Sequence, residues 1–379
     1  MKKKYIIFFI VTLVLLVALI TSFNYFKTTN AYIDDSVNNQ TKITKGISMN
    51  LEQTAGAGNY KTVTRSSWPT EGYKFNAELS RCENGSTLSW DDTKKAVIVS
   101  GNLSDKCYVY FDIYQPTLAE YIKSQYTGTQ GDNGIYYHNS TLANGAGDNS
   151  YRYAGASDSV NNYICLGSDA TTCPDANLFR IIGVFGDQTK VIRAKSVGNK
   201  QWHTSESNTW STSSLNTYLN GEYLTSLGTL ADKIATTTWK VGGGSWSNIS
   251  ASVPKTAYQN EVGSSASTTT VNKKIGLMYV SDYYYSASPS AWTLMGYNRD
   301  ATKDYRAAKT TNWLYLGSYE WTVSRYSDRT THAFSVTSTG DVLHSNVTDS
   351  YAVRPSFNLE SSVYVSGSGS MSDPVRVTD

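Results

Sequence analysis

The chain begins with a hydrophobic segment that restricts where the rest of it folds. Lys2, Lys3 and Lys4 precede an uncharged, mostly apolar run over residues 5–26. A helix of this length spans the roughly 30 Å hydrocarbon core of a membrane, and flanking lysines favour the cytoplasmic side. We therefore expect residues 1–31 to be a signal anchor with one transmembrane helix. The N-terminus is then cytoplasmic, and the bulk of this single-pass protein lies outside the cell.

A cleaved signal peptide is the alternative. It shares this layout, although its apolar region is shorter, and Thr29-Asn30-Ala31 fits the small-residue site that cleavage needs. Cleavage there makes the protein secreted. A buried helix of a soluble domain fits poorly, because apolar side chains cover every side of the run.

Cysteine usage agrees with export. The chain contains four cysteines in two well-separated pairs, Cys82 with Cys107 and Cys165 with Cys173. In an oxidising compartment such pairs are most simply two disulfides. A zinc site is not expected, because there is no Cys-x-x-Cys motif and the four histidines are scattered along the chain. No cofactor is expected either.

Composition excludes some partners and suggests others. The net charge is only +2 in 379 residues, so the chain has no dense basic field for nucleic acid. Charged residues make up 17%, whereas tyrosines number 29. Tyrosine with Ser, Gly and Asn is typical of recognition surfaces. The same tyrosines also suit ordinary strands, and composition alone leaves both interpretations open.

Turn signals divide the exported part into three segments. Residues 32–60 are polar and predict a spacer or a first strand without a strong period. Residues 61–114 contain short strand patterns about ten residues apart, separated by Asx and Gly turns, and predict a small β-sandwich-like domain stapled by a disulfide. Residues 115–379 mix helix and strand patterns and predict an α+β domain.

Three patterns of this last segment are specific. A helix begins after Thr117, which forms a capping box with Glu120. Residues 178–185 and 191–194 predict a hairpin in the core, joined by a Gly-Asp turn. Residues 274–280 predict a buried strand.

The order of motifs in residues 116–379 resembles an uncharacterised domain family of bacterial surface proteins. The motifs are Asn177-Leu-Phe-Arg-Ile-Ile-Gly-Val-Phe185, Leu215-Asn-Thr-Tyr-Leu-Asn-Gly221, 275–281, Trp313-Leu-Tyr315, Gly340-Asp341 and Tyr351-Ala-Val-Arg-Pro-Ser-Phe357. That family looks distantly like the C-type-lectin-like fold shared with formylglycine-generating enzymes. The resemblance implies a C-type-lectin-like domain with mixed short strands and two or three helices. The small β module before it looks like a companion of such domains.

No catalytic constellation is recognisable, and we expect no enzyme. Formylglycine-generating enzymes hold a metal with a cysteine pair near the C-terminus, whereas this chain has no cysteine after Cys173. Gly367-Ser368-Gly369 lacks the strand-turn-helix context of a nucleophile elbow, and Gly242-Gly243-Gly244 lacks the ending of a phosphate loop. Four glutamates in polar stretches are interpreted as solvated: Glu206, Glu222, Glu261 and Glu320.

One stretch is the candidate ligand site. Residues 313–316 and 333–336 look like paired core strands, and the segment between them is rich in aromatic, Arg and hydroxyl side chains, the usual anchors of interfaces. The predicted ligand-binding residues are Tyr315, Tyr319, Trp321, Arg325, Tyr326, Asp328, Arg329 and His332. For Trp321 burial in the core is an equal alternative.

These observations predict a recognition or adhesion protein that binds an extracellular glycan or protein. No Glu-Pro-Asn or Gln-Pro-Asp motif occurs, so sugar binding is expected to be independent of calcium. A surface scaffold without a specific ligand is the second hypothesis, and an extracellular enzyme of another mechanism is the third. Arg354 lies inside an apolar stretch and is expected to be buried against carbonyls or a carboxylate.

Overall fold

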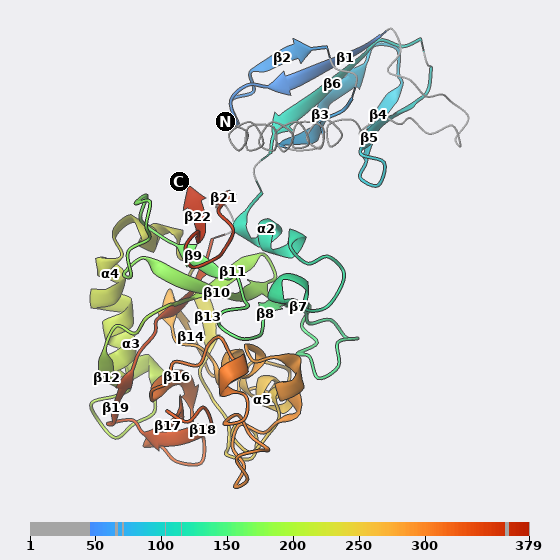
Figure 1. Ribbon diagram of the computed structural model, residues 1–379. Helices are drawn as coiled ribbons and strands as arrows, with labels where there is room; N and C mark the ends of the chain where they lie inside the picture. The colour runs from blue at the N-terminus through green and yellow to red at the C-terminus, as the bar shows by residue number, and fades with distance from the viewer. Residues whose placement is uncertain are drawn as a thin grey trace, which may run out of the picture. The chain divides into compact units, whose positions relative to one another are not determined.

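The computed structural model describes residues 46–64, 67–69, 72–102, 104–114, 116–360 and 364–378. The chain divides into two compact units between residues 115 and 116 (Figure 1). The predicted transmembrane segment, residues 5–26, lies outside the described residues. None of the helices within the described ranges is long and apolar enough to cross a membrane.

The first unit is a small β module. Its sheet has the strand order β2-β1-β6-β3, in which β1 is parallel to β6 and the other pairs are antiparallel. A separate hairpin of β4 and β5 completes the unit. The strands are β1 (Ile47–Glu52), β2 (Tyr60–Val63), β3 (Tyr73–Cys82), β4 (Thr87–Asp91), β5 (Ala96–Ser100) and β6 (Cys107–Ile113).

The module begins earlier than predicted. β1 lies inside residues 32–60, for which the sequence predicted a polar spacer or a first strand. Ile47, Met49 and Leu51 alternate with polar residues, the period-2 pattern of a strand, and Met49 and Leu51 are buried. Of the two alternatives for residues 32–60, the first strand therefore holds for this part of the segment.

Phe111 is the centre of the module's core. Its ring lies 5.7 Å from that of Trp90 and 5.9 Å from those of Trp68 and Phe75. A disulfide joins Cys82 to Cys107, which are direct partners across β3 and β6, so the predicted pairing is confirmed. A core this small gains stability from such a crosslink.

The second unit is built on two main sheets. The larger has the order β15-β20-β11-β10-β9-β22-β21, with β8 pairing β10 and β7; the other has the order β12-β19-β16-β17-β18, and β13 pairs β14. The strands are β7 (Ile135–Tyr137), β8 (Tyr151–Tyr153), β9 (Tyr163–Cys165), β10 (Leu178–Phe185), β11 (Gln188–Arg193), β12 (Asn199–Gln201), β13 (Thr237–Lys240), β14 (Thr270–Lys273), β15 (Ile275–Gly276), β16 (Glu320–Arg325), β17 (His332–Val336), β18 (Val342–Asn346), β19 (Ser350–Ala352), β20 (Ser356–Leu359), β21 (Tyr364–Ser366) and β22 (Val375–Thr378).

Local signals place several of these elements correctly. Thr117 and Glu120 form the predicted capping box at the start of α2 (Leu118–Ser124). The predicted hairpin is that of β10 and β11. The other helices are α3 (Ser214–Tyr218), α4 (Leu224–Ser226), α5 (Pro254–Glu261) and α6 (Val280–Tyr285). A second disulfide, Cys165–Cys173, confirms the other predicted pair.

The predicted fold class, α+β with a C-type-lectin-like domain and a transmembrane helix, is wrong. The structure is mostly sheet, and α5, with 8 residues, is its longest described α-helix. Short runs rich in Tyr, Thr, Val and Ile pair as strands more readily than they nucleate helices. The predicted strand over residues 274–280 also changes: only Ile275 and Gly276 pair, with β20, and α6 begins at Val280.

Candidate ligand-binding site

The predicted ligand-binding segment is not a single exposed loop. β16 lies inside it, whereas residues 313–316 are not a strand. Trp321 is fully buried, and its Nε1 donates a hydrogen bond of 2.9 Å to the Lys200 carbonyl, so the core alternative holds for this residue. Tyr319 is 39% exposed and packs on Tyr351, which also contacts Trp321.

The other predicted residues make contacts elsewhere. Tyr326 stacks on His344 with ring centroids 4.3 Å apart, and His332 lies 5.1 Å from His344. Arg329 is exposed. The remaining contacts are those of Tyr315 with the Ser338 carbonyl, Arg325 with the Gly242 carbonyl and Asp328 with the Trp246 N–H. Tyr326, Asp328, Arg329 and His332 are thus brought together around Asn208, Trp246 and His344, whereas Tyr319 and Trp321 pack on Tyr351. None of the eight predicted residues lines the pocket described below.

Two glutamates interpreted as solvated are in fact buried. Glu320 accepts two hydrogen bonds of 2.7 Å from Arg354, which also donates to the Leu314 carbonyl, and this confirms the structural interpretation of Arg354. Glu261 accepts hydrogen bonds from the N–H groups of Val280 and Ser281 at the start of α6. Both predictions failed because the polar residues next to each glutamate in the sequence do not reveal that its partners come from distant elements.

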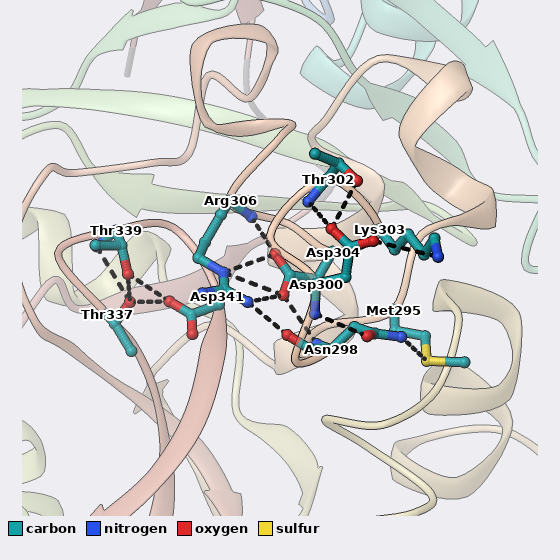
Figure 2. A network of polar contacts seen from close by, with 10 residues as sticks. All are labelled: Met295, Asn298, Asp300, Thr302, Lys303, Asp304, Arg306, Thr337, Thr339 and Asp341. Atoms are coloured by element: carbon teal, nitrogen blue, oxygen red, sulfur yellow. Dashed lines mark hydrogen bonds and ion pairs between the residues drawn. The ribbon is translucent and has the colours of Figure 1, made fainter.

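An acidic loop gives a second cluster of polar contacts, shown in Figure 2. Arg306 donates to both carboxylate oxygens of Asp304, which is fully buried, and to the Asn298 carbonyl. Asp341 accepts from Thr339 Oγ1 at 2.6 Å. Because the Asp304 carboxylate is already occupied by Arg306, we interpret these contacts as structural: they fix the conformation of the loop. Within the described part of the chain, no group of three or more His, Cys, Asp or Glu has metal-site geometry.

A pocket of about 230 Å³ in the second unit combines buried charges with aromatic walls. Its lining comes mainly from β8, β10, β11, β13, β20, α5 and α6, all in the second unit. We call it the Arg152–Asp282 pocket. Ligand sites are typically concave, with few polar groups among apolar and aromatic ones. This cavity is below the usual size for a whole drug-sized ligand and suits a single ring.

Four charged side chains form a connected network at this pocket. Lys190 Nζ lies 2.5 Å from Asp282 Oδ2, and Arg152 Nη2 lies 2.6 Å from Asp148 Oδ2. Arg152 Nη1 lies 3.9 Å from Asp282 Oδ1, which links the two pairs. Arg152, Lys190 and Asp282 are at most 6% exposed. Two cations thus face two anions.

Local structure holds each carboxylate in place. Asp282 accepts the N–H of Tyr279 at 2.8 Å, as the third residue of α6 in a capping box. Asp148 accepts the N–H and the hydroxyl of Ser150. Arg152 and Lys190 come from two strands that flank β10. The network is therefore fixed by sheet pairing and by one helix start.

Aromatic rings cover the cations. The ammonium of Lys190 lies 4.5 Å from the ring centroid of Tyr279 and 5.3 Å from that of Trp239. The guanidinium of Arg152 lies 5.2 Å from the ring centroid of Tyr258. Such contacts stabilise partly desolvated cations, and the same rings form apolar walls of the pocket.

The electrostatics favour the charged forms of Asp148 and Arg152. Burial by itself would raise the pKa of Asp148, but Arg152 and the Ser150 hydrogen bonds hold it well below its usual range. Burial opposes the charge of Arg152, yet Asp148 and Asp282 raise its pKa. Burial and Asp148 raise the pKa of Tyr258, so its hydroxyl stays protonated. At neutral pH Tyr258 is a donor and Asp148 an acceptor.

One polar atom of the pocket has no partner among the described residues. Asn358 is 8% exposed; its Nδ2 donates to Thr237 Oγ1 at 2.9 Å, while its Oδ1 is buried without a hydrogen bond. A buried unpaired acceptor costs free energy. A ligand donor reaching Asn358 would relieve that cost.

None of these pocket residues was predicted as a site. Lys190 is buried in β11 just before Val191 and Ile192, and Arg152 stands between two tyrosines. A cation inside an otherwise apolar or aromatic strand requires an anionic partner, and this signal was available. The partner of Lys190, Asp282, lies 92 positions further along the chain, so the sequence could not identify this pair.

Comparison with known proteins adds one match. Residues 186–361 match a family described as a domain of unknown function, DUF6273. Lys190, Asp282 and Asn358 lie inside the matched region, whereas Asp148 and Arg152 precede it. Searches of curated proteins and of solved structures found no match. The expected C-type-lectin-like family is therefore not shown.

Proposed function

We propose that this protein is an extracytoplasmic recognition protein that binds a neutral sugar unit of a glycan in the Arg152–Asp282 pocket. The observation that carries the proposal is the buried, balanced network of Arg152, Lys190, Asp148 and Asp282 beside aromatic walls. The two disulfides support a compartment outside the cytoplasm, because such bonds persist where conditions are oxidising.

Charge balance favours a neutral ligand. A ligand with net charge would compete with an existing ion pair and leave one buried charge uncompensated, at a cost of several kcal/mol. Lys240, at the edge of the pocket, adds one cation, but its Nζ donates to the Gly263 carbonyl. A neutral group with hydroxyls can bond the charged side chains without separating them.

A sugar ring also matches the other walls. Its C–H faces pack on aromatic rings such as Trp239 and Tyr258, while its hydroxyls both donate and accept. Asn358 is among the lining residues, and its Oδ1 has no hydrogen-bond partner among the described residues. The pocket size agrees with one ring, with the rest of the glycan outside.

Binding is favoured over hydrolysis. A glycosidase needs one carboxyl whose pKa is raised so that it donates a proton. The pKa of Asp148 is instead held low, and Asp282 is bound by Lys190 and by the Tyr279 N–H. Both carboxylates are thus arranged as acceptors.

The test is calorimetric titration of the full chain, purified in detergent because residues 5–26 are apolar. The ligands are glucose, galactose and mannose, each beside its uronic acid and its amine. Neutral hexoses are expected to bind more tightly than both charged forms of the same ring. Tighter binding of a uronic acid would assign recognition to Lys240 and overturn the neutral-ligand proposal.

Two tyrosine variants locate the site. Tyr258→Ala removes a pocket wall and is expected to abolish hexose binding, whereas Tyr319→Ala, at an exposed residue of the sequence-predicted set, leaves it unchanged. Loss only with Tyr319→Ala would favour that set instead. No binding of any sugar by the folded parent would favour the surface scaffold, the second hypothesis.

A further inference from the structure

A second pocket of about 370 Å³ lies in the same unit. Its lining includes Tyr121 of α2, Gln125 just after α2, residues of the turn at 131–134, Tyr153 of β8 and Ser368. Tyr153 follows Arg152 on the strand, and successive side chains of a strand point to opposite faces. We call it the Tyr153 pocket; β8 separates it from the first.

The chemistry of the Tyr153 pocket differs from that of the first. Its lining consists of Tyr, Asn, Gln, Ser, Gly and Val residues, without a charged side chain. Amides and hydroxyls each donate and accept hydrogen bonds, so they suit a ligand that does both. The turn is tightly held, because a Cβ on Gly131 would lie 2.6 Å from Tyr136 Oη.

The Tyr153 side chain provides the observation that points to a ligand. Tyr153 is only 4% exposed, lines the pocket, and its hydroxyl has no hydrogen bond to the described residues. Burial raises the pKa of this phenol, which therefore stays a neutral donor. Asn133 uses its Nδ2 to bind the Gln125 carbonyl at 2.9 Å, and nothing in the described ranges donates to its Oδ1.

We propose that the Tyr153 pocket is a second ligand site that binds the acetamido group of an N-acetylated sugar. The acetamido carbonyl accepts the Tyr153 hydroxyl, its N–H donates to an amide oxygen such as that of Asn133, and the sugar ring packs beside Tyr121. Because the group is neutral, it needs no counter-ion in a pocket without charges. The protein then binds glycans at two faces of β8.

The test is calorimetric titration of the full chain with N-acetylglucosamine and N-acetylgalactosamine, beside glucose and glucosamine, which lack the acetamide. Tyr153→Phe deletes one oxygen that has no protein partner, so thermal unfolding is expected to stay unchanged. Affinity for the acetylated sugars is expected to fall about tenfold, as for a lost hydrogen bond in a desolvated site. Tyr319→Ala, at an exposed residue that lines neither pocket, is the control and is expected to leave that affinity unchanged.

The outcomes separate the two sites. Acetylated-sugar binding that survives Tyr153→Phe but is lost with Tyr258→Ala would place all sugar binding in the first pocket and overturn this inference. No binding of acetylated sugars by the folded parent would overturn it as well. If the folded parent binds no hexose but binds the acetylated sugars in a manner that depends on Tyr153, the first site is rejected and the second is kept.

Discussion

The second unit buries charge in two places, and the two differ in what they leave available. Arg354 directs Nε and Nη2 at Glu320 and also binds the Leu314 carbonyl at 3% exposure, and neither member of the pair lines the Arg152–Asp282 pocket or the Tyr153 pocket. Arg152, Lys190 and Asp282 are buried to a similar degree, but together with the partly exposed Asp148 they face a cavity.

The difference shows that burial of charge has two uses. The Arg354–Glu320 pair directs its charge inward and holds β16 against the segment before β20. The four-residue network keeps hydrogen-bonding capacity at a surface that a ligand can reach. The comparison predicts a larger stability role for the pair and a larger binding role for the network.

The largest effect is expected from Arg354→Met. It leaves Glu320 buried without its cation and is expected to lower the free energy of unfolding of the second unit by about 3–5 kcal/mol. Urea unfolding of the full chain measures this. The double variant Arg354→Met/Glu320→Met is expected to recover most of the loss. If Arg354→Met lowers the free energy of unfolding by less than about 1 kcal/mol, the pair does not have the expected role in stability.

Lys190→Met is expected to cost less stability, about 2 kcal/mol, because Asp282 keeps the Tyr279 N–H and Arg152, and the cavity admits water. Hexose binding should be lost at the same time. Lys195→Met is the matched control: Lys195 pairs with Asp175 on the surface, and neither property should change. A cost equal to that of Arg354→Met would remove the distinction between the two clusters.

A pH effect of about 2 kcal/mol is expected from His138, which is fully buried near Arg152. Burial and then Arg152 lower its pKa well below 6.5, and its Nδ1 accepts the Ala146 N–H. The unfolded chain takes up a proton below pH 6.5 whereas the folded chain does not. Stability is therefore lost as pH falls, by about 2 kcal/mol between pH 6.5 and 5.

Urea unfolding at a series of pH values measures this slope. His138→Asn retains an acceptor but does not titrate in this range, so its slope between pH 6.5 and 5 should be smaller than that of the parent. An identical slope in the variant would assign the titration to other groups.

The smallest effect is expected from Tyr258→Phe, which removes the hydroxyl that bonds Asp148 but keeps the ring. Hexose affinity should fall by less than about tenfold, corresponding to about 1 kcal/mol. Calorimetry beside Tyr258→Ala separates the contribution of the ring from that of the hydroxyl. A complete loss with Tyr258→Phe would make the hydroxyl, rather than the aromatic wall, the main contact.

Residues close in the chain were the predictable part of this fold. The capping box of Thr117 and Glu120 and the hairpin of β10 and β11 depend on neighbours within a few positions. Strand β1 was readable in the same way, from the alternation of Ile47, Met49 and Leu51, but a first strand was only one of two alternatives for residues 32–60, because polar residues surround it.

The candidate sites were not predictable in the same way. The aromatic residues near Trp321 looked like an exposed surface, but Trp321 is covered by Tyr351 and donates to the Lys200 carbonyl. An aromatic-rich stretch has the same composition whether it is buried or exposed. Exposure is decided by which distant strands pack on it.

The sequence by itself determined the two disulfide pairs, the strand content of the small module and the turns that separate its strands, because each follows from local spacing. Only the tertiary structure decided that Arg152, Lys190 and Asp282 meet at one pocket and that Tyr153 faces another. The physical reason is that a buried charge must be paired wherever the chain brings its partner, and sheet pairing, not sequence distance, sets that position.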